Sequence, residues 1–486
     1  MGKSEEYSEV YALNRLAYYN NLGITLWMED NKLKFRASKD KLSPTIMEKL
    51  KRDKEVLIHG LAYKEVVEND YFPLTPIQTA YIAGSENNYE LGDTNAHYYT
   101  EYTIDNIDIG LLQIAINWVI KTNDALRLII EADGRQRVLK KVPIYSIETC
   151  RRKEDIRTAW SHHRYRLGEW PMFHFEVSQD EIPTLHFSFD CLIMDAFSAA
   201  LMLDQIFSIY NGEKPKRSKL QFEDYMRNIY MVTNKINTKA EAYWAERVKK
   251  MPGAPKLAYR KKFDEVEKTD FKRLEYEFSR KETQKLYDRL KDLFITPSAC
   301  MCTIFMKVLS VYSDEKEFTV TLTLFNRAPV HKDINLVLGD FTNIGFASYY
   351  VAKDVTFLEE LRETSKQFWK LVEFHSYDGT RVLKEMSRSI PGKAVMPIVF
   401  TSVLQGKLKS REELSYHDSF TISQTPQTAI DHQLRDDGEG MRLSWDYIEE
   451  LFDEIDIQKM FDTYIGFTRR IIEADDWKCR LEVEKI

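Results

Sequence analysis

A chain of 486 residues is too long for one ordinary hydrophobic core, so we expect two or three domains. With 43% hydrophobic and 30% charged residues it has the composition of a globular protein. A net charge of −7 with both signs intermixed gives no reason to expect nucleic acid or a membrane surface as the main ligand. The N-terminus lacks the apolar core of a signal peptide. Five scattered cysteines favour a reducing, cytoplasmic setting, and we expect no bound metal.

Residues 1–62 are predicted to form a small unit of their own. Apolar residues at helical spacing lead to Gly23, which supplies a left-handed helix stop. Two short strands, residues 24–28 and 32–36, flank a turn-prone triplet. Ser43 and Pro44 then begin a second helix, as N-cap and first-turn residue. The predicted order is helix, hairpin, helix.

The second strand of this hairpin carries three cations on one face, namely Lys32, Lys34 and Arg36. One interpretation is a solvated strand face. The other is a basic edge that accepts an acidic peptide as an added strand. The pattern alone favours the solvated face.

A charged connector, residues 63–70, is followed by mixed strands and helices from residue 71. Strict alternation predicts a strand over 184–189 that ends at Asp190. Asp195 is placed to cap a helix over 196–210, which closes at Asn211-Gly212.

The segment Met251-Pro-Gly-Ala-Pro255 predicts a boundary between two lobes, residues 71–250 and 251–486. The clearest strand of the second lobe is residues 317–325, where threonines alternate with apolar residues. Cys300 and Cys302 have a spacing that could serve a metal, but their apolar helical surroundings favour a place in the core.

Taken together, these segments resemble the heterocyclisation (Cy) domain of non-ribosomal peptide synthetases, with the family's motifs in order over roughly 415 residues. The matching pieces are Phe72-Pro-Leu-Thr75, Gln78, Ala80-Tyr81, Leu126-Arg127, Asp133-Gly-Arg-Gln136, the signature Asp190 to Ser198, Tyr243-Trp244, Thr296-Pro-Ser298, Leu322-Thr-Leu-Phe-Asn-Arg327, Gly339-Asp-Phe-Thr342, Met396 to Ser402, Gln424-Thr-Pro-Gln427, Asp431-His-Gln433 and Trp445-Asp446.

Residues 1–62 resemble the N-terminal docking domain of tubulysin-type synthetases, which grips the C-terminal tail of the preceding subunit. That resemblance shifts the balance toward the basic-edge interpretation. The chain departs from the Cy pattern at Thr122-Asn-Asp124, where a histidine is usual, and at Ser85, where an arginine is usual. These departures put detailed contacts to the carrier arms in doubt.

The resemblance implies an α/β fold of two chloramphenicol-acetyltransferase-like lobes in a V, with a tunnel between them. It implies an enzyme that joins an upstream acyl thioester to a carrier-bound Cys, Ser or Thr and then expels water to give a thiazoline or oxazoline. Both substrates arrive on phosphopantetheine arms of carrier domains, and no cofactor is bound directly. The implied partners are the upstream subunit's tail, the two carrier domains and an adjoining adenylation domain, with no nucleic acid or membrane.

Ordinary condensation domains place two adjacent histidines where this chain has Asp190 and Cys191. In the Cy family the cyclodehydration pair instead lies in the second lobe, at positions matching Thr401 and Asp431. We assign Asp431 as general acid/base and Thr401 as the hydroxyl that orients it or the adduct. Burial in a partly dry tunnel would raise the carboxyl pKa toward neutrality.

The remaining candidates are weaker. Asp195 is expected to cap its helix and pair with Arg327 or Arg127, as a structural brace. Asp190 is expected either to shape the tunnel floor or to bind the acceptor amine. Ser198 and Gln427 are expected to line the site. The adjacent pair His162-His163 lacks the Asp-Gly that a condensation dyad requires, so we expect it at the surface or in helix packing.

Two other functions stay open at this point. The chain could condense without cyclising, or it could be a catalytically silent platform for carriers. It stops where an adenylation domain would normally begin, so we expect a piece of a longer synthetase or a free-standing domain. The donor substrate and the choice among Cys, Ser and Thr do not follow from the sequence.

Overall fold

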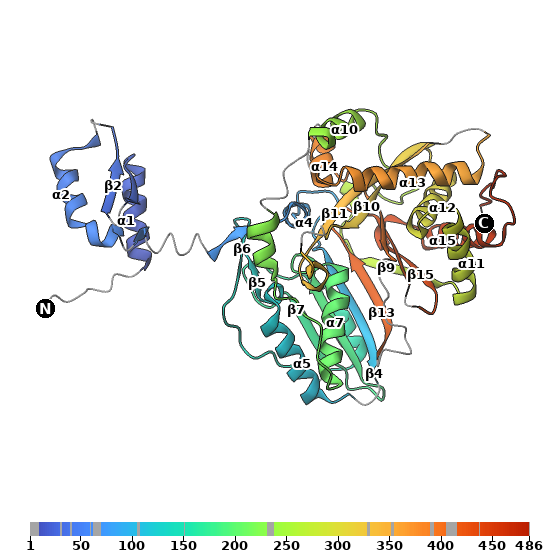
Figure 1. Ribbon diagram of the computed structural model, residues 1–486, viewed down its shortest axis with the longest axis horizontal. Helices are drawn as coiled ribbons and strands as arrows, with labels where there is room; N and C mark the ends of the chain where they lie inside the picture. The colour runs from blue at the N-terminus through green and yellow to red at the C-terminus, as the bar shows by residue number, and fades with distance from the viewer. Residues whose placement is uncertain are drawn as a thin grey trace. The chain divides into compact units, whose positions relative to one another are not determined.

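The computed structural model describes residues 9–29, 32–38, 41–58, 60–61, 70–104, 107–149, 151–230, 238–327, 331–350, 354–388, 393–404, 416–436 and 438–485. It divides into two compact units, Met1–Pro73 with Arg135–Val138, and Leu74–Gly134 with Leu139–Ile486. The elements of each unit are labelled in Figure 1. Most of the predicted connector, residues 63–70, lies outside the described residues.

The first unit contains the predicted helix, hairpin and helix. Its elements are α1 Glu9–Asn21, β1 Thr25–Glu29, β2 Lys32–Arg36 and α2 Pro44–Arg52. Gly23 adopts a φ of 75° after α1, as the left-handed stop requires. Ser43 caps α2 by accepting a hydrogen bond from the Ile46 N–H, with Pro44 in the first turn. The local sequence signals therefore predicted the order of these elements correctly, and the bounds 1–62 stay a prediction.

The small core of this unit is built from both helices and the hairpin. Its fully or nearly buried members are Leu16, Tyr19, Ile24, Leu26, Leu50 and Leu57. Asp53 lies at its edge, where it accepts a 2.8 Å hydrogen bond from the Tyr19 hydroxyl and pairs with Arg15. A second small piece of the same unit pairs β3 Phe72–Pro73 with β6 Arg135–Val138, and Gln136 Nε2 donates to the Pro73 carbonyl at 2.9 Å.

The second unit contains a four-stranded antiparallel sheet in the order β13-β4-β8-β7. Its strands are β4 His97–Ile104, β7 Phe173–Val177, β8 Thr184–Asp190 and β13 Tyr416–Gln424. The predicted strand over 184–189 is therefore confirmed. Strand β13 comes from beyond the predicted lobe boundary at 250/251, yet it pairs with β4 along its whole length. That boundary stays a prediction, and the second half contributes an edge strand to the first half's sheet.

Helices accompany this sheet in the same part of the chain. They are α4 Pro76–Gly84, α5 Ile109–Thr122, α6 Lys153–Trp160 and α7 Ala196–Tyr210, with the short β5 Leu128–Ile130 and α8 Phe222–Tyr225. Helices α5 and α7 lie side by side (Figure 1). The helix predicted over 196–210 is α7, with Asp195 as its N-cap.

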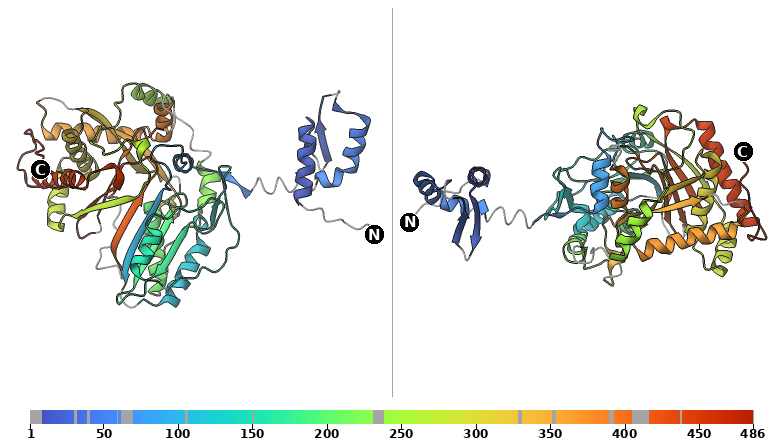
Figure 2. Two further views of the ribbon diagram at one scale, coloured as in Figure 1. Left: turned by 180° about the vertical axis from the view of Figure 1, so that it is seen from behind. Right: turned by 90° about the horizontal axis from the view of Figure 1, so that it is seen from above.

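The rest of the second unit is built around a six-stranded mixed sheet in the order β11-β10-β12-β14-β15-β9. Its strands are β9 Phe271–Glu277, β10 Glu317–Phe325, β11 Thr342–Tyr350, β12 Ile398–Val403, β14 Ile430–Asp436 and β15 Met441–Ile448. Its helices are α10 Thr238–Val248, α11 Arg280–Asp292, α12 Pro297–Tyr312, α13 Phe357–Glu373, α14 Gly379–Ser387 and α15 Glu454–Glu473. In both views of Figure 2, α15 lies at the edge of this unit near the C-terminus.

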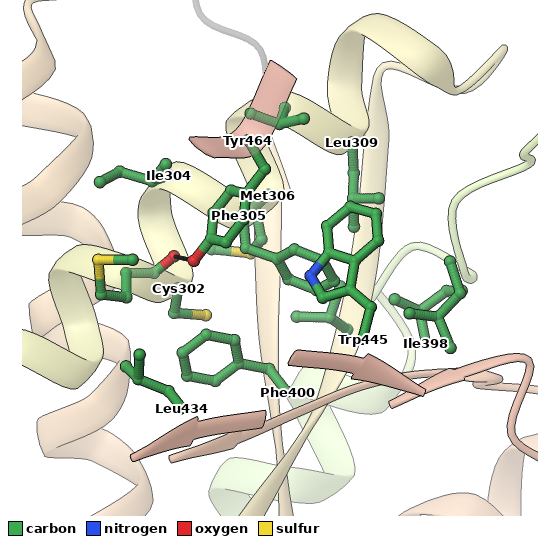
Figure 3. Packing of buried hydrophobic residues seen from close by; sticks show 14 of the residues in the cluster. Cys302, Ile304, Phe305, Met306, Leu309, Ile398, Phe400, Leu434, Trp445 and Tyr464 are labelled. Carbon is green, nitrogen blue, oxygen red and sulfur yellow. Dashed lines mark hydrogen bonds between the residues drawn. The ribbon is translucent and has the colours of Figure 1, made fainter. Parts of the chain in front are cut away.

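One face of the six-stranded sheet is apolar and packs on α12 and α15. Figure 3 shows Phe400 and Trp445 of the sheet meeting Phe305 of α12 and Tyr464 of α15. The ring centroids of Phe305 and Trp445 are 5.5 Å apart. Burying a side chain of this size stabilises the fold by about 1.5–3 kcal/mol. Cys300 and Cys302 are fully buried in the same core, which confirms their interpretation as core residues.

The opposite face of this sheet is polar, because strand residues alternate between the two faces. The parallel pairing of β12 with β14 and the antiparallel pairing of β14 with β15 and β15 with β9 bring its polar residues into adjacent rows. These residues are Thr323, Thr401, Asp431, Gln433, Asp446 and Arg273. The sheet therefore carries a polar layer on the face away from α12 and α15, with Asp431 and Asp446 buried and the other four residues half-buried.

In the described part of the chain, no single helix has both the length and the apolar character needed to cross a membrane. The bent pair α11–α12 would meet those criteria only if its two helices were taken together. Within the same residues, no group of three or more His, Cys, Asp or Glu side chains is arranged to hold a metal ion.

Candidate active site

Asp431 lies in the middle of the polar layer, on the central strand β14, and is 5% exposed. Both of its carboxyl oxygens accept hydrogen bonds. The Thr401 hydroxyl donates to Oδ1 at 3.1 Å, and Gln433 Nε2 donates to Oδ2 at 3.0 Å. Thr401 is half-buried on β12, beside Asp431 on the neighbouring parallel strand. The structure thus brings together the two residues that the resemblance assigned to cyclodehydration.

The pKa of Asp431 is raised to about 7, chiefly because burial penalises its charged form, with a further contribution from the charge of Asp446. The hydrogen bonds from Gln433 and Thr401 oppose this shift. Arg273, whose charge lowers this pKa slightly, is occupied by a two-pronged ion pair with Asp446 at 2.7 and 2.6 Å. Asp431 is therefore a carboxyl group that can both take up and release a proton near neutral pH.

A row of hydroxyls continues from this carboxyl. Thr323 of β10 lies 2.8 Å from Thr401, Oγ1 to Oγ1. Thr401 has one hydroxyl proton, and its donation to Asp431 leaves the oxygen free to accept from Thr323. The pair Thr323 and Thr401 can therefore hold the orientation of the Asp431 carboxyl.

On the first sheet's side, Asp195 is the brace that the sequence predicts. It caps α7 by accepting from the Ser198 N–H at 2.6 Å, and it pairs with Arg327 at 3.2 Å. Of the two arginines considered, Arg127 instead donates to the backbone carbonyls of Ile120 and Leu139. The partner of Asp195 is thus Arg327.

Ser198 belongs to the same brace. Its hydroxyl donates to the Gly339 carbonyl at 2.7 Å and accepts from Arg327 Nη2 at 2.7 Å. It is fully buried, so its contacts are structural, and its predicted place lining the site stays a prediction.

Asp190 ends β8 and is fully buried. It accepts hydrogen bonds from Asn95 Nδ2 at 2.8 Å and the Leu192 N–H at 2.9 Å. Burial raises its pKa to about 7. The next residue, Cys191, is half-buried, and burial followed by the charge of Asp190 raises its thiol pKa well above the usual range. The Cys191 thiol therefore stays protonated at neutral pH and cannot replace an imidazole as a base. Both predicted roles of Asp190 stay predictions.

Gln427 occupies the turn between β13 and β14 with a φ of 61°, and its N–H donates to the Leu91 carbonyl at 2.9 Å. Its predicted place in the site lining is not tested by this backbone contact. His162 contacts Gln424, Nδ1 to Oε1, at 3.0 Å, and the His163 ring lies 4.3 Å from that of Trp160. The adjacent histidines therefore pack within the fold, as expected.

In the first unit, Lys32, Lys34 and Arg36 all lie on β2, and their side chains are exposed. Strand β2 pairs with β1 in a sheet of two strands. Its other edge is therefore not used within this sheet.

The sequence reasoning missed two residues with clear contacts to the predicted pair. Gln433 shares the strand face of Asp431, and the i, i+2 spacing within Asp431-His-Gln433 was a usable signal. Thr323 shares a face with Thr401 only through the pairing of β10 with β12, which no local pattern reveals.

Comparisons with known proteins show the family to which the chain belongs. Residues 68–482 match the condensation-domain family, and residues 15–62 match the TubC N-terminal docking domain. The chain is 27% identical over 480 residues to pyochelin synthetase PchF of Pseudomonas aeruginosa, covering 93% of the chain and 26% of that protein. It is 25% identical over 433 residues to phenyloxazoline synthase MbtB of Mycobacterium tuberculosis, covering 84% and 30%. The chain thus spans less than a third of either relative.

Among solved structures, the EpoB cyclization-docking bidomain from Sorangium cellulosum is similar, with a TM-score of 0.76 and 25% identity over 96% of this chain and 99% of that one. The match covers both the small N-terminal unit and the two sheets. The chain belongs to the condensation-domain family, and its residues 15–62 match the TubC N-terminal docking domain that precedes it.

Proposed function

We propose that this chain joins a carrier-bound acyl group to carrier-bound Cys, Ser or Thr and then closes the side chain onto the new amide to form a thiazoline or oxazoline. The observation that carries this proposal is Asp431, a buried carboxyl of near-neutral pKa held at both oxygens by Thr401 and Gln433. Ordinary amide formation from a thioester gains much of its rate from positioning alone. Loss of water from an amide requires a group that moves protons, and Asp431 supplies one.

The proposed reaction has two stages. First, the acceptor amine attacks the thioester carbon, a C–N bond forms, and the C–S bond breaks to release the donor arm as a thiol. Next, the Cys sulfur or Ser/Thr oxygen attacks the amide carbon. The Asp431 carboxylate takes the proton from that sulfur or oxygen and passes it to the former carbonyl oxygen.

Asp431 then takes the proton from nitrogen and delivers it to the same oxygen, which leaves as water while the C=N bond forms. The carboxyl ends this cycle as it began. Thr401 and Gln433 keep its two oxygens in place throughout, so we regard both as positioning residues.

The partners follow from this reaction and from the docking unit. We infer that donor and acceptor arrive on phosphopantetheine arms of upstream and downstream carrier domains, with an adenylation domain adjoining. The cations Lys32, Lys34 and Arg36 on β2 fit an acidic C-terminal tail of the upstream subunit, added as a third strand. A reducing cytoplasm agrees with the four described cysteines, which are all free: Cys191, Cys300, Cys302 and Cys479.

Mass spectrometry of the products tests the function. Donor carriers bearing acetyl or benzoyl groups are mixed with acceptor carriers bearing Cys, Ser or Thr. We expect a product 18 Da lighter than the amide with at least one acceptor (the mass of the expelled water). Uncyclised amide as the sole product with all three would support condensation alone, and the absence of any amide would support a silent platform.

The docking proposal has its own test. Reversing the three cations to Glu should weaken binding of an acidic tail peptide and reduce the salt sensitivity of that binding. The matched control reverses Lys49, Lys51 and Arg52 on α2, which keeps the change in net charge the same. Equal losses in both variants would indicate general attraction rather than recognition by β2.

A further inference from the structure

Asp340 is a buried carboxyl group that the proposed mechanism does not use. It precedes β11 and is 1% exposed. Its Oδ1 accepts a 3.0 Å hydrogen bond from the Thr342 N–H. Its Oδ2 is buried, and nothing in the described part of the chain hydrogen-bonds to it. Leaving a buried polar atom unsatisfied costs about 1–3 kcal/mol, so a fold that keeps one needs a reason.

The backbone on both sides of Asp340 is held by the signature residues. Ser198 bonds to the carbonyl and the N–H of Gly339, at 2.7 and 3.1 Å. Asp195 accepts from the Phe341 N–H at 3.1 Å, and Arg327, which pairs with Asp195, lies over the Phe341 ring. The brace around Asp195 therefore fixes the position of Asp340.

Gly339 shows how tight this support is. A Cβ at that position would lie 2.2 Å from the ring of Phe222, so only glycine fits beside Asp340. The signature residues thus hold the backbone of both neighbours of Asp340, Gly339 and Phe341. The arrangement matches the rule that functional groups are held by a rigid supporting shell.

The charged and titratable groups that act on Asp340, or on which it acts, come from four segments. They are Asp195 at the start of α7, Arg327 after β10, Tyr81 on α4 and Cys191 after β8. Burial, together with the charge of Asp195, raises the pKa of Asp340 to about 8 against the opposing hydrogen bonds from Thr342. At neutral pH the group is therefore mainly an acid that carries its proton. Because Oδ1 accepts from Thr342, the proton resides on Oδ2.

Two half-buried side chains link Asp340 to the cyclodehydration pair. The charges of Asp340 and Asp431 both raise the pKa of Tyr81 and of Cys191, after burial itself. The site thus has two buried acids. Asp431 lies on β14 and Asp340 directly precedes β11 of the same sheet. The charges of both act on Cys191, the position at which an ordinary condensation domain has an imidazole.

We propose that Asp340 is a catalytic residue of the amide-forming stage, donating a hydrogen bond from Oδ2 to the acyl carbonyl oxygen. This inference rests on the proposed function. As the amine attacks the thioester carbon, that oxygen gains negative charge, and the Oδ2–H donor stabilises it. The C–S bond then breaks, the departing sulfur takes the amine's proton, and Asp340 keeps its own. The orphaned atom is thereby satisfied by the substrate.

Single-turnover amide formation with a benzoyl-loaded donor and a cysteine-loaded acceptor carrier tests this assignment, with amide and ring products summed. Asp340→Ala removes the donor and should slow the reaction about 10²–10³-fold. Asp340→Asn keeps an N–H donor of the same shape and should slow it by only about fivefold, since an amide is the weaker donor. Thermal unfolding of both variants checks that they fold.

The pH profile provides the decisive reading, because a structural role would not change it. In the parent chain, amide formation should fall about eightfold between pH 7.5 and 9 as Asp340 loses its proton. In Asp340→Asn that fall should vanish. An unchanged alkaline fall in Asp340→Asn, or equal rates in the Ala and Asn variants, would overturn the assignment.

The same assays distinguish a failure of the proposed heterocyclase function from a failure of the role proposed for Asp340. A parent chain that forms no amide, or amide without ring, contradicts the heterocyclase function whatever the Asp340 variants do. Conversely, if the parent makes the ring and Asp340→Ala forms amide at the parental rate, the heterocyclase function stands and only the role of Asp340 falls.

Discussion

Asp195 and Asp431 are both buried carboxyl groups in family motifs, yet only Asp195 is paired with a cation, and this difference suits them to different roles. Asp195 caps a helix and faces Arg327, so its charge is matched by a cation and by backbone N–H groups. Asp431 receives only neutral donors, while the nearby Arg273 is taken by Asp446. A carboxylate beside its own cation and N–H donors is suited to holding structure. A carboxyl buried without one can change its protonation state during a reaction.

The largest effect should come from removing the titrating group. Asp431→Asn keeps the shape of the side chain and cannot carry a proton, so ring closure should slow by about 10²–10⁴-fold and the uncyclised amide should accumulate. Quenched single-turnover reactions analysed by mass spectrometry measure both products. Ring formation at the parental rate would remove Asp431 from the chemistry.

The structural role of Asp195 is tested by replacing its partner, Arg327. Arg327→Met leaves Asp195 buried without its cation and should lower the free energy of unfolding by about 3–5 kcal/mol. Arg127→Met, the arginine that bonds only to backbone carbonyls among its described contacts, is the matched control and should cost less. Denaturant unfolding of the two variants measures the difference. Equal losses would mean that the ion pair with Asp195 is not what matters.

The neutral donors to Asp431 are tested at Thr401. Thr401→Val removes the hydroxyl that donates to Oδ1 while keeping the volume of the side chain. A hydrogen bond to a charged group is worth about 1.5–3 kcal/mol, so ring closure should slow by about tenfold to a hundredfold. Thr401→Ser, which keeps the hydroxyl, should recover most of that rate in the same assay. A Val variant as fast as the parent would limit Thr401 to packing.

The smallest effect is a pH dependence. In the proposed reaction, ring closure begins with the carboxylate form of Asp431, whose pKa is about 7. Lowering the pH protonates that form, so the rate should fall about eightfold between pH 7.5 and 6. The preformed linear amide on the acceptor carrier is used as substrate, which removes amide formation from the measurement. A rate that rises toward acid would mean that the reaction starts from protonated Asp431.

The elements with local signals were predictable, and the long-range contacts were not. Asp195 before α7 and Ser43-Pro44 before α2 are capping patterns read within a few residues. The choice between Arg327 and Arg127 as the partner of Asp195 depends on which strand end meets α7. Arg327 is 132 residues from Asp195 in the chain, so no short sequence pattern reveals the pairing.

The site shows the same division. The resemblance proposed Thr401 and Asp431, which prove to be hydrogen-bonded, and alternation within β14 could have added Gln433. The orphaned Oδ2 of Asp340 could not have been foreseen, because it depends on which donors the fold fails to bring to one atom. The insertion of β13 beside β4 was equally hidden, since its partner lies more than 300 residues earlier.

That inserted strand has a practical consequence for exchanging parts between synthetases. A cut at residues 250/251 would strip the first sheet of its edge strand and expose the backbone of β4 to pairing with other chains. In a chimera that replaces only the first half, β4 of the other synthetase would have to pair with the β13 of this chain across eight residue pairs. Residues 416–424 are therefore better exchanged together with the first half, because they form the edge strand of its sheet.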